Sequence, residues 1–204
     1  MPRSAVLLSA ALGALCSQPG CADRIGHAQP DAALPAPDAG NRDALPAGKV
    51  QTTRGSDATY TTVVDATSYT EWIYADFETG VAVDASAAWD LRFQRFHISA
   101  NGGVSGPGGV EVAAVPEAFA DVTTAPTGGY LSDAGDADGD GMPDYAFDQG
   151  DSWYDYNDVT HALTPKAITW VMKTAGGATL KLEILTYYDI AGSPAWFTLH
   201  WAPL

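Results

Sequence analysis

Hydrophobic and polar residues alternate along several short segments of the chain. Residues 89–94 read Trp-Asp-Leu-Arg-Phe-Gln, and residues 167–174, 179–187 and 195–201 follow the same period of two. Because successive side chains of a strand point to opposite faces, this period predicts short β-strands with one buried face. Two consecutive glycines separate the second segment from the third, which is typical of a hairpin turn. We therefore expect an antiparallel meander near the C-terminus.

Little of the remaining sequence favours helices. Only residues 116–122 match a helical pattern, for one or two turns. Residues 110–112 are a further candidate strand, and residues 189–194 are rich in turn-forming residues. We therefore predict a single antiparallel all-β domain over residues 59–204, with at most one or two short helices.

The N-terminal residues have the features of an export signal followed by a tether. Arg3 precedes an apolar run of 11 residues, Ala5–Leu15, which suits a signal peptide and is too short to span a bilayer. Residues 22–58 are rich in Ala, Pro, Asp and Gly and contain no aromatic residue before Asp57. Such a composition cannot bury enough surface to fold, so we expect a disordered tether.

Two cleavage positions fit this export signal. In the first, residues 1–21 form a lipoprotein-type signal, and Cys21, preceded by the small Gly20, carries the lipid anchor. In the second, an ordinary signal peptidase cuts after Ala22 and releases a secreted protein. The first position predicts a lipoprotein of the outer membrane or cell surface, and it gives the tether a purpose.

Charge and cysteine content exclude several classes of partner and site. Ten Lys and Arg against 25 Asp and Glu give a net charge of −15, so the chain repels the phosphates of nucleic acid. The two cysteines of the sequence, Cys16 and Cys21, both lie in the export segment. The domain therefore has no thiol for a disulfide, a zinc–thiolate site, an iron–sulfur cluster or a nucleophile.

The sequence lacks the motifs of common enzyme classes. None of His27, His97, His161 and His200 has a second histidine at the spacing of a zinc-binding pair. There is no Gly-x-Ser-x-Gly motif, and the glycine-rich residues 102–109 lack the lysine and the following helix of a phosphate-binding loop. We therefore predict that the protein is not an enzyme.

An acidic segment that begins at Asp136 resembles a calcium loop. Carboxylates occupy positions 1, 3, 5 and 9 with glycine at position 6, as in an EF-hand, while position 12 is Phe147 instead of a bidentate glutamate. Position 7 coordinates through its backbone carbonyl. The alternative is a solvated acidic surface loop. The candidate calcium ligands are Asp136, Asp138, Asp140, Met142, Asp144 and Asp148.

Aromatic residues are dense around this acidic segment. They are Tyr130, Tyr145, Trp153, Tyr154 and Tyr156. In a small β domain most such residues pack in the core. The alternative is an aromatic wall for a flat apolar ligand.

Four blocks of the sequence follow the pattern of one known family. Residues 63–74 are similar to its opening strand, and residues 89–103 match a block that reads Trp-Asp, then Arg, then Asn-Gly-Gly. Residues 122–130 resemble a third block, and residues 181–189 with residues 197–201 resemble its closing hairpin. The family is the HmuY-like haem-binding lipoproteins of Gram-negative bacteria, and the blocks together cover the predicted domain.

This resemblance implies an exported all-β lipoprotein that binds one haem through two axial side chains and hands it to a TonB-dependent outer-membrane receptor. The family's ligand positions fall nearest to Met142 and His161 here, and thioether with imidazole is a known axial set. The alternative is a calcium-stabilised surface β module of the same fold that has lost haem and acts in interaction or structure. The colour of the protein after incubation with haemin separates the two hypotheses.

Overall fold

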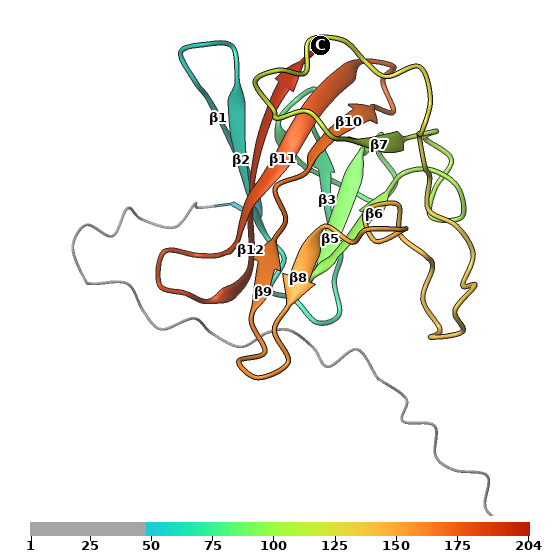
Figure 1. The fold of residues 1–204 in the computed structure, drawn as a ribbon, viewed down its shortest axis with the longest axis vertical. Coiled ribbons are helices and arrows are strands. Elements are labelled where there is room, and N and C mark those ends of the chain that lie inside the picture. Colours follow the sequence, from blue (N-terminus) through green and yellow to red (C-terminus); the bar gives the residue numbers. More distant parts are fainter. Residues whose placement is uncertain (1–47) are drawn as a thin grey trace, which may run out of the picture.

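The computed structural model describes residues 48–204, which form twelve β-strands and, within that range, no helix. Ten strands make one antiparallel sheet in the order β6-β5-β3-β4-β1-β2-β12-β11-β10-β7, and β8 and β9 form a separate hairpin (Figure 1). This confirms the all-β prediction. The strands are β1 Val50–Arg54, β2 Tyr60–Asp65, β3 Ile73–Asp76, β4 Val81–Val83, β5 Leu91–Gln94, β6 His97–Ala100, β7 Glu111–Val115, β8 Tyr154–Tyr156, β9 Leu163–Pro165, β10 Thr169–Lys173, β11 Thr179–Tyr188 and β12 Pro194–Pro203.

The predicted C-terminal meander is present as β10, β11 and β12. Gly177 has a φ of 91° in the turn between β10 and β11, a conformation that favours glycine. Along β12 the buried residues Phe197, Leu199 and Trp201 alternate with partly exposed ones, as the period of two predicted. β10 differs, because four consecutive residues, Thr169 to Met172, are buried and both of its faces are therefore covered.

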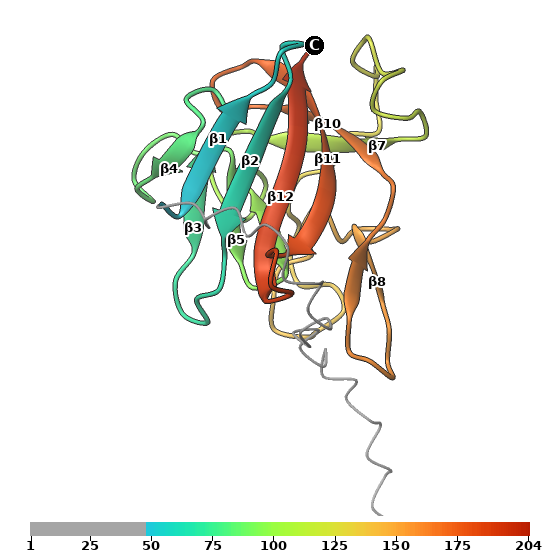
Figure 2. The ribbon, with the colours of Figure 1, turned by 90° about the vertical axis from the view of Figure 1, so that its left-hand side faces the viewer.

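The ten-stranded sheet curls over on itself, so that β5 and β7, from its two ends, lie behind β2, β12 and β11 (Figure 2). The ring of Phe93 in β5 lies 5.2 Å from that of Phe197 in β12, although four strands separate β5 from β12 in the sheet order. The core lies between these two layers. Its largest fully buried side chains include Trp153, Tyr187 and Phe147.

Residues 131–133 join the two ends of the curled sheet. Leu131 pairs with Val112 of β7, and the Asp133 carboxylate accepts a hydrogen bond from the backbone N–H of Ala100 in β6. The sheet is therefore almost closed into a barrel, with this short segment in the gap. The segment also begins the acidic loop, residues 133–152, which forms one wall of the site below.

Two expectations about local structure were wrong. Residues 116–122 form bends and a turn rather than a helix: the N–H of Asp121 bonds to the carbonyl of Ala118, and Lys181 donates to the carbonyls of Phe119 and Val122. The folded part also begins before residue 59. β1 lies within the expected tether and pairs with β2 through five consecutive residues, from Val50 opposite Val64 to Arg54 opposite Tyr60.

The remaining expectations for the N-terminus concern residues outside the described range. The export signal, Cys21 and the tether up to residue 47 all fall there. Residues 48–204 contain no helix of the length and apolar character that crossing a membrane requires.

The sequence block at residues 89–103 is explained by the fold. The Asp90 carboxylate accepts hydrogen bonds from the backbone N–H groups of Phe77 and Ala175, and Asn101 donates to the carbonyl of Trp89. At Gly103, where φ is 58°, an added Cβ would overlap the carbonyl oxygen of Asp133. These residues hold β5 and β6 in place. The turn between the two strands contributes to the site described below.

Candidate functional site

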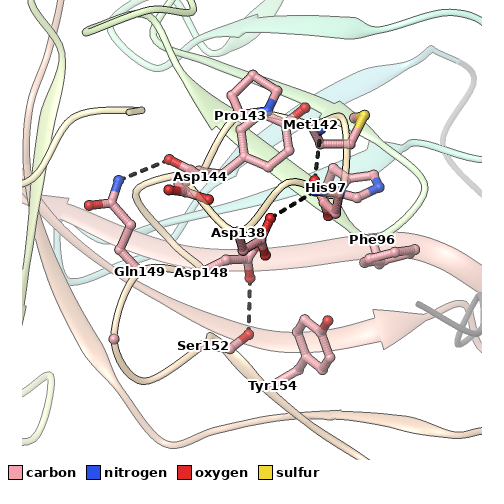
Figure 3. Close-up of a pocket in the computed structure, with 13 residues that line it drawn as sticks. Phe96, His97, Asp138, Met142, Pro143, Asp144, Asp148, Gln149, Ser152 and Tyr154 are labelled. Carbon is pink, nitrogen blue, oxygen red and sulfur yellow. Dashed lines mark hydrogen bonds between the residues drawn. The ribbon is translucent and has the colours of Figure 1, made fainter. Parts of the chain in front are cut away.

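A cavity of about 400 Å³ opens between the turn that joins β5 to β6, the acidic loop and β8. This volume lies within the range of small-molecule sites. We call it the acidic cavity. Its lining residues, drawn in Figure 3, are Phe96, His97, Asp138, Asp140, Met142, Pro143, Asp144, Tyr145, Asp148, Gln149, Gly150, Ser152 and Tyr154.

Aromatic rings form a continuous chain along one side of the acidic cavity. Ring centroids are 6.2 Å apart for Tyr154 and Phe96, 4.1 Å for Phe96 and His97, and 5.5 Å for His97 and Tyr145. Trp72 continues the chain at 5.9 Å from Tyr145. Two of the five aromatic residues highlighted in the sequence therefore line a pocket, and this chain gives a flat apolar ligand a surface to pack against.

The two tyrosines of this chain remain protonated at neutral pH. Burial raises the pKa of Tyr145 to about 12, and the nearby Arg92 only partly offsets it. Burial also raises the pKa of Tyr154 to about 12, and the negative charge of Asp148 adds to that effect. A phenolate ligand to a metal is therefore disfavoured at either position.

Two side chains with soft or borderline metal-binding atoms line the acidic cavity, the thioether of Met142 and the imidazole of His97. The backbone N–H of Met142 donates to Asp140 at 2.7 Å, which fixes this part of the loop. His97 is the first residue of β6 and pairs with Gln94 across a two-residue turn. Sequence reasoning proposed Met142 as a candidate ligand, and it did not propose His97, because that histidine has no second histidine at a metal-binding spacing.

His161, the other histidine proposed from sequence, lies elsewhere. It occupies the turn between β8 and β9, is exposed, and has a φ of 56°. Its Nδ1 lies 2.6 Å from the hydroxyl of Tyr156. Among residues 48–204, the lining of the acidic cavity includes Met142 but not His161.

Three of the candidate calcium ligands come together. One carboxylate oxygen from each of Asp136, Asp138 and Asp140 lies within 4.8 Å of the other two. Asp136 also accepts hydrogen bonds from the backbone N–H groups of Gly139, Asp140 and Gly141, which shape the loop.

The other candidate calcium ligands are used differently. Asp144 accepts from the backbone N–H of Ala137, and Asp148 accepts from the Ser152 hydroxyl. Phe147, at the position of the missing glutamate, is fully buried with its ring 4.8 Å from that of Trp170. The loop therefore combines part of a calcium motif with a core anchor.

Asp133 holds the acidic loop against β6. Its carboxylate accepts from the Ser99 hydroxyl at 2.7 Å, from the Ala100 N–H at 3.1 Å and from the Ala146 N–H at 2.9 Å. Burial raises the pKa of Asp133, while these hydrogen bonds act in the opposite direction. Gln149 adds a second anchor, since its side-chain amide donates to the carbonyls of Ser132 and Asp144.

The charge around the acidic cavity is strongly negative. Asp138, Asp140, Asp144 and Asp148 contribute to its lining, and no Lys or Arg among residues 48–204 does. An anionic ligand therefore meets repulsion on the loop side unless its charges face solvent or a bound cation offsets the carboxylates. The aromatic side carries no such penalty.

Comparison with known proteins agrees with this architecture. The family model described as HmuY protein matches residues 68–201. A solved structure described as a candidate lipoprotein from Bacteroides fragilis is similar, with a TM-score of 0.56 and 19% identity over 78% of this chain and 97% of that one. No curated protein sequence matches.

Two further solved structures share the fold. One, described as a candidate HmuY-like haem-binding protein from Bacteroides vulgatus, has a TM-score of 0.56 and 18% identity over 76% of this chain and 96% of that one. The other, the apo HmuY analogue of Tannerella forsythia, has a TM-score of 0.55 and 18% identity over 74% and 95%. At these identities the likeness establishes the fold.

Proposed function

Because this chain belongs to the HmuY family, we propose that it is a haem-binding protein and that the acidic cavity is its haem site. The observation that carries the proposal is the meeting of a thioether, an imidazole and a chain of aromatic rings in one cavity. Bound haem would supply an iron with two axial positions, which thioether and imidazole ligands can fill.

The acidic cavity fits haem by its donor atoms and its aromatic side. Tyr145 and Tyr154 offer apolar ring surface rather than charge, since their hydroxyls stay protonated. The four lining aspartates favour an orientation in which the haem propionates point away from the acidic loop. Met142 of the loop would supply one ligand to the iron, and a histidine would supply the other: either His161, as the sequence suggested, or His97, which lines the cavity.

The biological role that fits these features is haem capture without catalysis. One relative of the same fold is described as a candidate lipoprotein, in agreement with an anchor at Cys21 and exposure outside the cytoplasm. We propose that the anchored protein passes haem to an outer-membrane receptor. Replacing Cys21 with Ser should move the protein from the membrane to the soluble fraction, and retention in the membrane would contradict the anchor.

A bound calcium ion is a second proposal. The clustered carboxylates of Asp136, Asp138 and Asp140 repel one another, and a divalent cation would reverse that interaction. The ion would also reduce the repulsion between the acidic loop and haem propionates. If the protein does not bind haem, the calcium site supports the alternative function, which is a calcium-stabilised β module.

Haemin titration tests the proposed function. We expect a shifted Soret band that saturates at one haem per chain, and a weaker response after Met142→Leu, which keeps the side-chain volume but removes the sulfur. Val159→Ala, at an exposed position in the β8–β9 turn, serves as the control. Haemin that shows no saturable spectral change with the native chain would contradict a haem-binding function.

A further inference from the structure

The β5–β6 hairpin presents His97 from a fixed position. The turn residue Arg95 donates its backbone N–H to Ala66 at 2.8 Å and its guanidinium to the carbonyl of Thr67 at 2.7 Å. These bonds tie the turn to the segment after β2. His97 follows directly and is held by the ladder between β5 and β6. Its imidazole therefore reaches the acidic cavity from a rigid element.

The Met142 side of the acidic cavity is fixed by different contacts. Asp133 and Gln149 anchor the loop shortly after Met142, because Asp133 accepts from the N–H of Ala146 and Gln149 donates to the carbonyl of Asp144. Figure 3 shows Met142 and His97 at the same end of the cavity. Both side chains therefore line the same cavity, although they come from separate elements.

His161 is less suited to this role. Its turn is exposed and is closed by local hydrogen bonds, from the N–H groups of Val159 and Thr160 to the Asn157 side chain. The imidazole contacts Tyr156 rather than the acidic cavity. Using it as a partner of Met142 would require the hairpin of β8 and β9 to move.

We propose that His97, together with Met142, supplies the axial pair for haem in this chain. This inference rests on the proposed haem-binding function and names the residue that completes its site. The imidazole contacts the rings of both Phe96 and Tyr145, with centroids 4.1 and 5.5 Å away, so a porphyrin ligated by it would lie against the aromatic side of the cavity. The ligands then come from two segments far apart in sequence, a strand and a loop.

Three variants separate this pair from the alternative. In His97→Ala we expect the six-coordinate low-spin spectrum to be lost and haemin affinity to fall about tenfold or more, because an axial ligand contributes at least as much as a residue that only supports one. Free imidazole should restore the low-spin spectrum in this variant at concentrations that leave protein-free haemin high-spin. Met142→Leu should also become high-spin, while His161→Ala should match the native chain.

The possible results test the role of His97 separately from haem binding itself. A native chain that binds haemin, with an unchanged spectrum in His97→Ala, overturns the role of His97 and leaves haem binding intact. Loss of the low-spin spectrum in His161→Ala assigns the ligand to the other histidine and also overturns it. A native chain that does not bind haemin overturns both. Circular dichroism and thermal melting of each variant show that the fold is retained.

Discussion

The two walls of the acidic cavity are built in different ways. The β5–β6 wall is a hairpin with four consecutive residue pairs, from Leu91 opposite Ala100 to Gln94 opposite His97. The facing wall, residues 133–152, contains a single bridge, between Ala134 and Asp144. In most of its other local hydrogen bonds an aspartate side chain is the acceptor. Asp136, for example, accepts from three backbone N–H groups.

This difference has a physical consequence. Backbone ladders do not depend on protonation, whereas carboxylate acceptors change with pH and with bound cations. The hairpin wall should therefore keep its shape under conditions that alter the loop wall. We expect the ligand geometry of the site to respond to acid and to calcium through the loop alone, and the following variants test that separation.

The largest effect is expected where the two walls meet, at Gly103. In Gly103→Ala the new Cβ overlaps the carbonyl of Asp133, in addition to the cost of a positive φ. We expect a loss of unfolding free energy of roughly 3 kcal/mol or more, measured by chemical denaturation.

Gly109→Ala is the matched control for this change. Gly109 also has a positive φ, of 69°, but an added Cβ meets no atom within 4 Å. Gly109→Ala should lower the free energy of unfolding only by the cost of a positive φ in a residue with a Cβ, about 1–2 kcal/mol. Equal costs at the two glycines would show that the close approach to the loop wall does not matter for stability.

The next effect concerns Asp133, the main anchor of the loop wall. Asp133→Ala leaves the buried N–H groups of Ala100 and Ala146 without their acceptor. Each such group costs about 1–3 kcal/mol, and haemin affinity should fall with stability because Met142 loses its support. Asp84→Ala, at an exposed aspartate, is the control and should change neither quantity. If Asp133→Ala is destabilised but binds haemin as the native chain does, haemin binding does not depend on this anchor.

The pH dependence of stability should carry opposite signs at two aspartates. Burial raises the pKa of Asp133 in the folded protein. Its contribution to the free energy of unfolding is therefore fully present below the unfolded-state pKa, near 3.8, and is lost as pH rises through the folded-state pKa. Acidification from neutral pH towards pH 4 should therefore stabilise the native chain relative to Asp133→Asn. Thermal melts of both proteins across this range measure the difference, and a difference independent of pH would contradict it.

Asp65, away from the acidic cavity, provides the opposite case. Burial acts to raise its pKa, but hydrogen bonds from Lys49 and Thr67 outweigh burial and leave the pKa lowered. Its contribution is present above the unfolded pKa and is lost as pH falls through the folded value. The native chain should thus lose stability relative to Asp65→Asn below about pH 4.

The smallest effect is expected from calcium. With a dissociation constant on the order of 10⁻⁴ to 10⁻³ M, 1 mM calcium should stabilise the native chain by about 0.4–1.4 kcal/mol. Asp138→Asn combined with Asp140→Asn should remove that gain, whereas Asp151→Asn, an exposed aspartate outside the cluster, should keep it. A melting temperature that is the same with calcium and with chelator would exclude the ion.

The sequence predicted the sheet better than it predicted the site. Alternation identified β5, β11 and β12, because each of these strands has one buried and one partly exposed face. It missed β1, whose segment lacks aromatic residues and is stabilised by its pairing with β2. It also predicted a helix over residues 116–122, where the chain instead forms a turn that contacts Lys181 of β11, a partner distant in sequence.

The acidic cavity was only partly predictable for a related reason. Met142 was found through the family resemblance and the acidic motif, both of which are local in sequence. His97 stood alone in the sequence, about 45 residues before Met142, and no spacing rule connects a strand end to a distant loop. The buried Asp133 brings the two together, and its partners become visible only in the folded chain.

We propose that haem binds between the β5–β6 hairpin and the acidic loop. Amide NMR spectra of the isotope-labelled chain, recorded with gallium protoporphyrin IX as a diamagnetic haem analogue, test this claim most directly. We predict ring-current shifts that concentrate at Phe96, His97, Tyr145 and Ser152, with little change around the separate pocket formed by Tyr60 and Trp201. Shifts that concentrate at Tyr60 and Trp201, or no shifts at all, would contradict the account.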